Sequence, residues 1–139
     1  MISDRSKLIA VDFDGTIVED KYPQIGKPML FAIETLLKLQ EDGHRLILWT
    51  YRSGRALREA VEFCREKGIE FYAVNASYPE EEFDHSQGSR KIHADIFIDD
   101  RNFGGFPGWG EIYQKISGQS ADQLEKRGRK KRKGLFGFK

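Results

Sequence analysis

The chain has 139 residues, of which 39% are hydrophobic, and its formal net charge is +1. This length and composition indicate one globular domain with its own core, and they exclude a disordered or fibrous chain. A single cysteine, Cys64, excludes an internal disulfide and favours a reducing compartment. Neither a secretory signal nor a membrane-spanning apolar run is visible, so we expect a cytoplasmic protein.

Charge is divided unevenly along the chain. Residues 126–139 hold eight Lys and Arg and no acid, which leaves 15 basic against 22 acidic side chains in residues 1–125. We therefore predict a core over residues 1–120 and a basic tail over residues 121–139. Such a tail is typical of segments that bind nucleic acid or an anionic membrane surface, although a solvated end without a partner explains it equally well. The acidic core would also attract the tail of a neighbouring subunit, so a homo-oligomer is a further alternative.

The predicted elements alternate between strands and helices. A strand begins at Leu8, and later strands are expected over residues 45–50, 69–74 and 94–99. Helices are expected from Pro28 to Gly43, from a capping Ser53 to Gly68, and after the glycine-rich loop 104–110. An irregular or hairpin excursion over 17–27 and a polar loop over 75–89 connect them. Because each strand is apolar throughout, the pattern predicts an α/β fold, with a Rossmann-like parallel sheet covered by helices on both faces.

The ends of these strands carry the polar residues that suggest chemistry. Parallel sheets bind ligands outside the carboxyl ends of their strands. One edge of the sheet would therefore gather four carboxylates, a hydroxyl and an ammonium group: Asp12, Asp14, Asp99, Asp100, Thr50 and Lys91. Gly15 follows the first pair and allows a sharp turn whose amide groups could cradle an anion.

This set of groups is typical of phosphoryl transfer. Clustered carboxylates without sulfur or imidazole partners favour a hard cation, and Mg²⁺ suits a site that must also hold phosphate oxygens. One carboxylate can attack phosphorus and form an aspartyl-phosphate, while a second protonates the leaving oxygen and then activates water. Lys91, the Thr50 hydroxyl and backbone amides would stabilise the charge of the transferring group.

Asp-Phe-Asp-Gly-Thr at residues 12–16, followed by Thr50, Lys91 and the pair Asp99-Asp100, resembles the motifs of the haloacid dehalogenase (HAD) superfamily of phosphatases. The resemblance spans roughly residues 7–101. It implies that Asp12 is the nucleophile, that Asp14 is the general acid and base, and that Thr50 and Lys91 bind the phosphoryl group. It also implies that Mg²⁺ is held by Asp12, Asp99 and the backbone carbonyl of Asp14, with Asp100 in support.

Two features bear on this resemblance. Lys91 stands only eight positions before Asp99, closer than in many relatives, so Arg90 is an alternative for the lysine role. The segments 17–45 and 53–90 are too short for a folded cap domain, which predicts a small capless member. The sequence does not identify the substrate, and a sugar phosphate, a nucleotide, a phosphoprotein, a nucleic-acid end or another phosphomonoester all fit.

Contacts to the rest of the substrate are predicted at Arg52, Tyr78 and His85. For Arg52 the alternative is a residue at the entry of a helix that pairs with acids. A second function, from a different class, is that of a nucleic-acid-associated protein that binds through residues 126–139. The two combine in a phosphatase that acts on polynucleotide ends.

Overall fold

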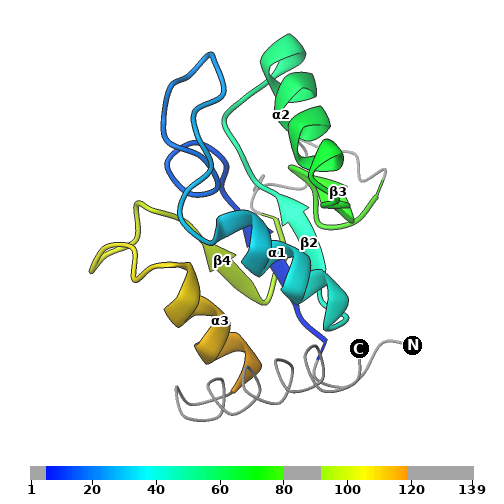
Figure 1. Cartoon of the computed structure of the whole chain (residues 1–139). Helices are drawn as coiled ribbons and strands as arrows, with labels where there is room; N and C mark the ends of the chain where they lie inside the picture. Colours follow the sequence, from blue (N-terminus) through cyan, green and yellow to red (C-terminus); the bar gives the residue numbers. More distant parts are fainter. Residues whose placement is uncertain (1–5, 80–91, 119–139) are drawn as a thin grey trace, which may run out of the picture. The chain divides into compact units, whose positions relative to one another are not determined.

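The computed structural model describes residues 6–79 and 92–118 (Figure 1). The chain divides into two compact units, Met1–Phe106 and Pro107–Lys139. The first unit holds a sheet and two helices. The second holds the helix α3 (Trp109–Ser117), which buries Trp109, Ile112 and Tyr113.

The sheet has four strands in the order β3-β2-β1-β4, and every neighbouring pair is parallel. The strands are β1 (Leu8–Val11), β2 (Arg45–Leu48), β3 (Ala73–Val74) and β4 (Ile96–Ile98). The prediction of an α/β fold with a parallel sheet is therefore confirmed. Because β1 pairs with β2 on one side and with β4 on the other, the direction of chain winding reverses beside β1.

Buried apolar side chains lie on both faces of the central strands, as their unbroken apolar sequences predict. On one face, Ala10 and Ile47 form a cluster with Ala73 and Ile92. On the other face, Ile9, Val11, Leu46 and Leu48 are at most 1% exposed. Burial on both faces pins the register of β1 and β2, since a slip by one residue would exchange the two sets. The polar residues that follow these strands are thereby placed at one edge.

The helix α1 (Ala32–Glu41) packs against β2 (Figure 1). Its prediction from Pro28 was wrong at the beginning, because Pro28 pairs with Val18 in an antiparallel bridge and the amide of Met29 donates to Ile17 O. Phe31 then adopts a left-handed conformation, with φ of 64°, and the helix starts after it. Leu30, which precedes the observed start, is 77% exposed, and α1 contributes Ala32, Leu36 and Leu39 to the core.

The helix α2 (Gly54–Glu66) ends near the end of α1, since Gln40 of α1 bonds to Gly68 O and to the amide of Glu70 in the segment that follows α2. Ser53 precedes it as predicted, but its side chain makes no capping hydrogen bond. Cys64 is fully buried, and burial raises the pKa of its thiol to about 12. Cys64 therefore belongs to the core.

The excursion between β1 and α1 is a closed loop rather than a free one. Val18 pairs with Asp14 and with Pro28, and the amide of Glu19 donates to Lys27 O at 2.7 Å. Gly26 permits this closure, because a Cβ there would lie 2.2 Å from Glu19 O. The loop therefore stands beside the carboxyl edge of the sheet.

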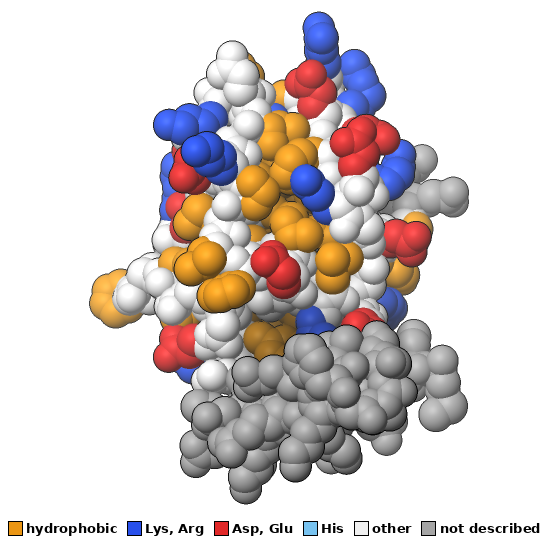
Figure 2. Space-filling view, viewed as in Figure 1, with side chains coloured by type: hydrophobic (Ala, Val, Ile, Leu, Met, Phe, Trp, Pro, Cys, Tyr) orange, Lys and Arg blue, Asp and Glu red, His pale blue; other side chains and the backbone are white. Residues whose placement is uncertain are grey.

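The face seen in Figure 2 shows apolar side chains between charged ones, and the large exposed apolar residues of the first unit include Leu30 and Phe31. Within the described residues, no helix has the length and apolar character needed to cross a membrane.

Candidate active site

Asp12 follows β1 directly, and Asp99 and Asp100 follow β4, so the two neighbouring strands deliver three carboxylates to one place. The amide of Asp12 donates to Ile98 O at 2.9 Å, which ties the two strand ends together. Since the chain winds away from β1 in opposite directions on its two sides, this place is the topological switch point of the sheet. In open α/β sheets that is where ligands bind.

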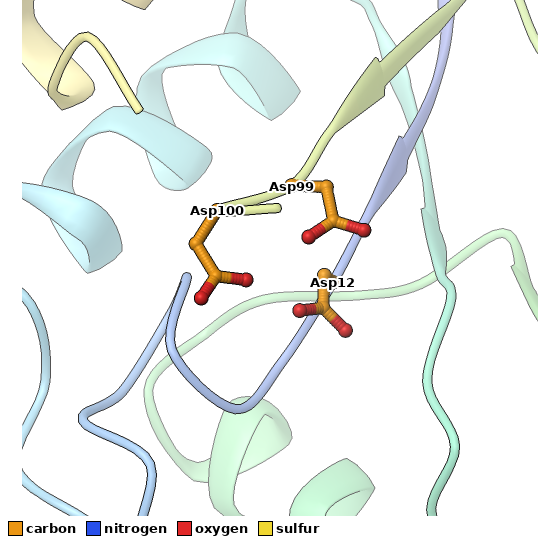
Figure 3. Close-up of side chains that lie close together, drawn as sticks. All are labelled: Asp12, Asp99 and Asp100. Carbon is orange, nitrogen blue, oxygen red and sulfur yellow. The ribbon is translucent and has the colours of Figure 1, made fainter. Parts of the chain in front are cut away.

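The three carboxylates point toward one another (Figure 3). Asp12, Asp99 and Asp100 each offer one oxygen, and these oxygens lie within 4.8 Å of one another. All three side chains are only partly buried, so an ion from solvent can reach them. This is the arrangement that the spacing of the two acidic motifs predicts.

Thr16, for which the sequence predicts no role, contacts both Asp12 and Asp100. Its hydroxyl is fully buried and lies 3.3 Å from both Asp12 Oδ2 and Asp100 Oδ1, while it accepts the amide hydrogen of Asp100 at 3.0 Å. Its place in the first motif, two residues after Asp14, is the feature of the sequence that could have indicated a role in the site. Thr16 therefore binds the amide of Asp100 and, with its single hydroxyl hydrogen, either of the two carboxylates.

Gly15 brings the backbone close to Asp100. Its φ is +85°, and a Cβ at this position would lie 2.5 Å from Asp100 Oδ2. Both the conformation and the space therefore require glycine. Its amide donates to Val18 O at 2.7 Å and so closes the local turn, which means that this amide is engaged within the protein.

The electrostatics of the cluster favour a cation. Burial, together with the negative charges of Asp99 and Asp100, raises the pKa of Asp12 from 3.8 to about 7. Two or three ionised carboxylates at this distance repel one another unless a positive charge lies between them.

Asp14 does not join this cluster. Its two oxygens accept from Nε and Nη2 of Arg52, both at 2.8 Å, in a bidentate ion pair. Arg52 is 2% exposed, and hydrogen bonding to Asp14 raises the pKa of its guanidinium. The pairing with an acid, which was the alternative for Arg52, is what the structure shows. The sequence does not reveal it, since 38 residues separate the partners.

A hollow of about 330 Å³ opens over the carboxyl edge. It is lined by Asp12, Asp14, Asp20, Tyr22, Thr50, Tyr51, Arg52, Asp99 and Arg101. Two hydrogen bonds fix Thr50 there. Its amide donates to Asn75 Oδ1 at 2.8 Å, and its hydroxyl accepts from the amide of Arg52 at 3.1 Å. Asp12, Asp14, Thr50 and Asp99 thus face one shared space, and Asp20, Tyr22, Tyr51 and Arg101 are lining residues that sequence reasoning missed.

Of the remaining predicted residues, one does not line this hollow, and the others lie outside the residues that the structure describes. Tyr78 is 52% exposed and is not among the lining residues. Lys91, its alternative Arg90, and His85 lie outside the described residues, as does the basic tail over 126–139. Asp14 was also expected at the metal, through its backbone carbonyl. Its carboxylate pairs with Arg52, and the role of its carbonyl stays a prediction.

No protein-family model and no curated protein matches the chain. Among solved structures, the chain is similar to one described as a conserved protein from Bacteroides thetaiotaomicron, with 55% sequence identity and a TM-score of 0.75. The two chains share one fold. The match covers 86% of this chain and 97% of that one. The similarity therefore supports the α/β architecture over nearly the full length of the relative.

Proposed function

We propose that this protein is a magnesium-dependent phosphomonoester hydrolase of the HAD type, acting through an aspartyl-phosphate. The observation that carries the proposal is the convergence of Asp12, Asp99 and Asp100 at the switch point of the sheet, beside a hollow that Asp14 and Thr50 also line. A nucleophile, a second carboxylate and a cluster of hard-cation ligands in one place are what this reaction requires.

The residues present fit Mg²⁺. The cluster consists of oxygen ligands only, and burial together with the charges of Asp99 and Asp100 raises the pKa of Asp12, so a cation between the carboxylates would favour its ionised form. Asp12 and Asp99 would hold the ion, with Asp100 fixed through Thr16 in support. When bound, Mg²⁺ supplies neutralising charge to the phosphoryl oxygens and keeps Asp12 ionised near neutral pH.

The protein's own residues then perform two displacements. Asp12 attacks phosphorus through a carboxylate oxygen, and the bond from phosphorus to the ester oxygen breaks, so the phosphoryl group passes to Asp12. Asp14 enters this step in its protonated form and donates that proton to the departing oxygen. Asp14 next takes a proton from a water molecule, which attacks the aspartyl-phosphate and releases inorganic phosphate and the free carboxylate. Thr50 binds the phosphoryl oxygens, together with the cation that the resemblance assigns to Lys91.

The fold that we propose for this chemistry is Rossmann-like and has no cap domain. The excursion that closes through Glu19 and Lys27 is compact, and α2 begins four residues after Thr50. Access to the hollow is then set by short local segments, among them the excursion residues Asp20 and Tyr22. Such an open site suits small phosphomonoesters, and it would also admit a bulky one.

The test is hydrolysis of p-nitrophenyl phosphate by the purified full chain. We expect release of phosphate that needs Mg²⁺, stops on chelation with EDTA, and falls at least about 10³-fold in Asp12→Asn, since the nucleophile is lost. The matched control is Asp95→Asn, an exposed aspartate that bonds to the amide of Leu8 at the other end of β1. Activity that survives in Asp12→Asn would contradict the assigned nucleophile.

A second candidate function rests on the charge distribution of the chain. Eight basic residues within 126–139 follow an acidic body, which favours association with nucleic acid through the tail. We expect RNA or DNA binding that weakens steeply with salt and disappears when residues 126–139 are removed. Absence of binding at low salt would exclude this function, while the hydrolysis assay is independent of it.

A further inference from the structure

Arg52 is the most completely engaged side chain near the site. All five of its N–H groups have acceptors: Nε and Nη2 donate to Asp14, Nη2 also donates to Gln24 O at 2.7 Å, and Nη1 donates to Pro23 O at 3.1 Å and Ala56 O at 3.2 Å. The guanidinium carbon also lies 5.0 Å from the Phe13 ring centroid and 5.1 Å from that of Tyr22. The guanidinium therefore has no hydrogen left for a substrate.

These contacts join three separate parts of the chain. Asp14 belongs to the turn after β1, Pro23 and Gln24 belong to the excursion, and Ala56 lies in the first turn of α2. Arg52 thus connects the turn that carries Asp14 to the wall of the hollow that carries Tyr22. A lysine could supply the charge at this place, but it could not supply five donors in a planar fork.

Stability alone is a poor explanation for this arrangement. A buried ion pair gains little over well-packed apolar side chains, because both charges lose their hydration. What the guanidinium does supply is a fixed orientation of the Asp14 carboxylate. Asp14 is held at both oxygens, yet a carboxylate has about four lone-pair positions, so each oxygen keeps one for a further partner. The carboxylate is consequently fixed in orientation while still open to the hollow that it lines.

We propose that Arg52 is a positioning residue, which holds the Asp14 carboxylate and the excursion wall in the geometry needed for proton transfer. This inference rests on the proposed phosphatase function. It assigns Arg52 an action through Asp14 and no contact with substrate, in place of the substrate contact that the sequence suggested. A displacement of about 1 Å in such a group lowers the rate about 10²-fold, so a large effect on kcat with little effect on KM is expected.

The test is a double-mutant cycle on hydrolysis of p-nitrophenyl phosphate, with the single variants Arg52→Lys and Asp14→Asn and the double variant. We expect Arg52→Lys to lower kcat about 10²-fold and to change KM less than about threefold. In the Asp14→Asn background, Arg52→Lys should lower kcat less than about threefold further, because the group through which it acts is already disabled. Arg55→Ala is the control, since the ion pair of this exposed arginine among the described residues is with Glu59 on the same helix.

Arg52→Ala gives a second test that does not depend on the lysine variant. Guanidinium ion at tens of millimolar should restore at least about tenfold of the lost kcat by occupying the vacated site, and tetramethylammonium at the same ionic strength should not. Equal losses in kcat from Arg52→Lys in both backgrounds, or a loss that guanidinium leaves unchanged, would overturn the inference alone. Absence of magnesium-dependent hydrolysis by the wild-type chain would overturn the inference together with the proposed function.

Discussion

Replacing Asp12 by asparagine should stabilise the metal-free protein at alkaline pH. Burial and two neighbouring carboxylates raise the pKa of Asp12 from 3.8 to about 7 in the folded state. A group whose folded pKa is raised contributes stability below its unfolded pKa, and this contribution is lost as the pH rises through the folded value. Metal-free wild-type protein should therefore lose stability between about pH 4 and pH 7, whereas Asp12→Asn lacks this loss.

The magnitude follows from the shift. About three pKa units at 1.36 kcal/mol each give an upper value of about 4 kcal/mol, and solvent screening at this partly buried site reduces it to about 2–4 kcal/mol. At roughly 4 °C per kcal/mol, the Tm of Asp12→Asn should exceed that of wild type by about 8–16 °C at pH 8 in EDTA. At pH 4 the difference should be below about 1 kcal/mol, because this pH is close to the unfolded pKa of 3.8 and little of the contribution has yet been lost.

The assay is thermal unfolding followed by circular dichroism at pH 4 and pH 8, in EDTA and in Mg²⁺. Saturating Mg²⁺ should raise the Tm of wild type at pH 8 and leave that of Asp12→Asn unchanged, since the ion binds only the intact cluster. The exposed control Asp95→Asn should change stability by less than about 0.5 kcal/mol at both pH values. Equal Tm values for wild type and Asp12→Asn at pH 8 in EDTA would refute the reasoning about the cluster.

Three further predictions test individual parts of the site. Gly15→Ala should lower stability by about 1–3 kcal/mol and weaken Mg²⁺ binding in calorimetry, because its φ is +85° and the new Cβ would collide with Asp100; unchanged binding would contradict this. Thr16→Val should lower stability by about 1–3 kcal/mol in urea unfolding at pH 8, whereas Thr16→Ser should recover most of it, since the buried hydroxyl serves Asp12 and Asp100. Gly26→Ala should raise the susceptibility of the excursion to proteolysis, because its Cβ would meet Glu19 O; a cleavage pattern like that of wild type would argue against a closed excursion.

The strands and the acidic edge were predictable because their signals are local. Apolar runs of four to six residues placed β1 and β2 within two residues of their observed bounds, and parallel pairing follows from strands that alternate with helices. Once the strands are parallel, Asp12 and Asp99 must follow them at the same edge. The convergence of the carboxylates therefore follows from the order of motifs along the chain.

The features that sequence reasoning missed depend on tertiary contacts or on unusual backbone conformations. The left-handed φ of Phe31 delays α1, although the residues before it follow a helical pattern. Only Ala73–Val74 of the expected third strand pairs as a strand, while Ile69 is buried because it closes the end of α2. The pairing of Arg52 with Asp14 joins residues that no short motif connects. The contact of Thr16 with Asp100 likewise joins residues that are 84 positions apart.

The most direct test of the central claim is chemical capture of the phosphorylated residue. Wild-type protein is mixed with a phosphomonoester and Mg²⁺, quenched within milliseconds, and treated with borohydride, which reduces an aspartyl-phosphate to homoserine. Peptide mass spectrometry should then find homoserine at position 12 and nowhere else, with none formed when EDTA replaces Mg²⁺. Turnover without any modified aspartate, or with modification at another aspartate such as Asp99, would contradict the account.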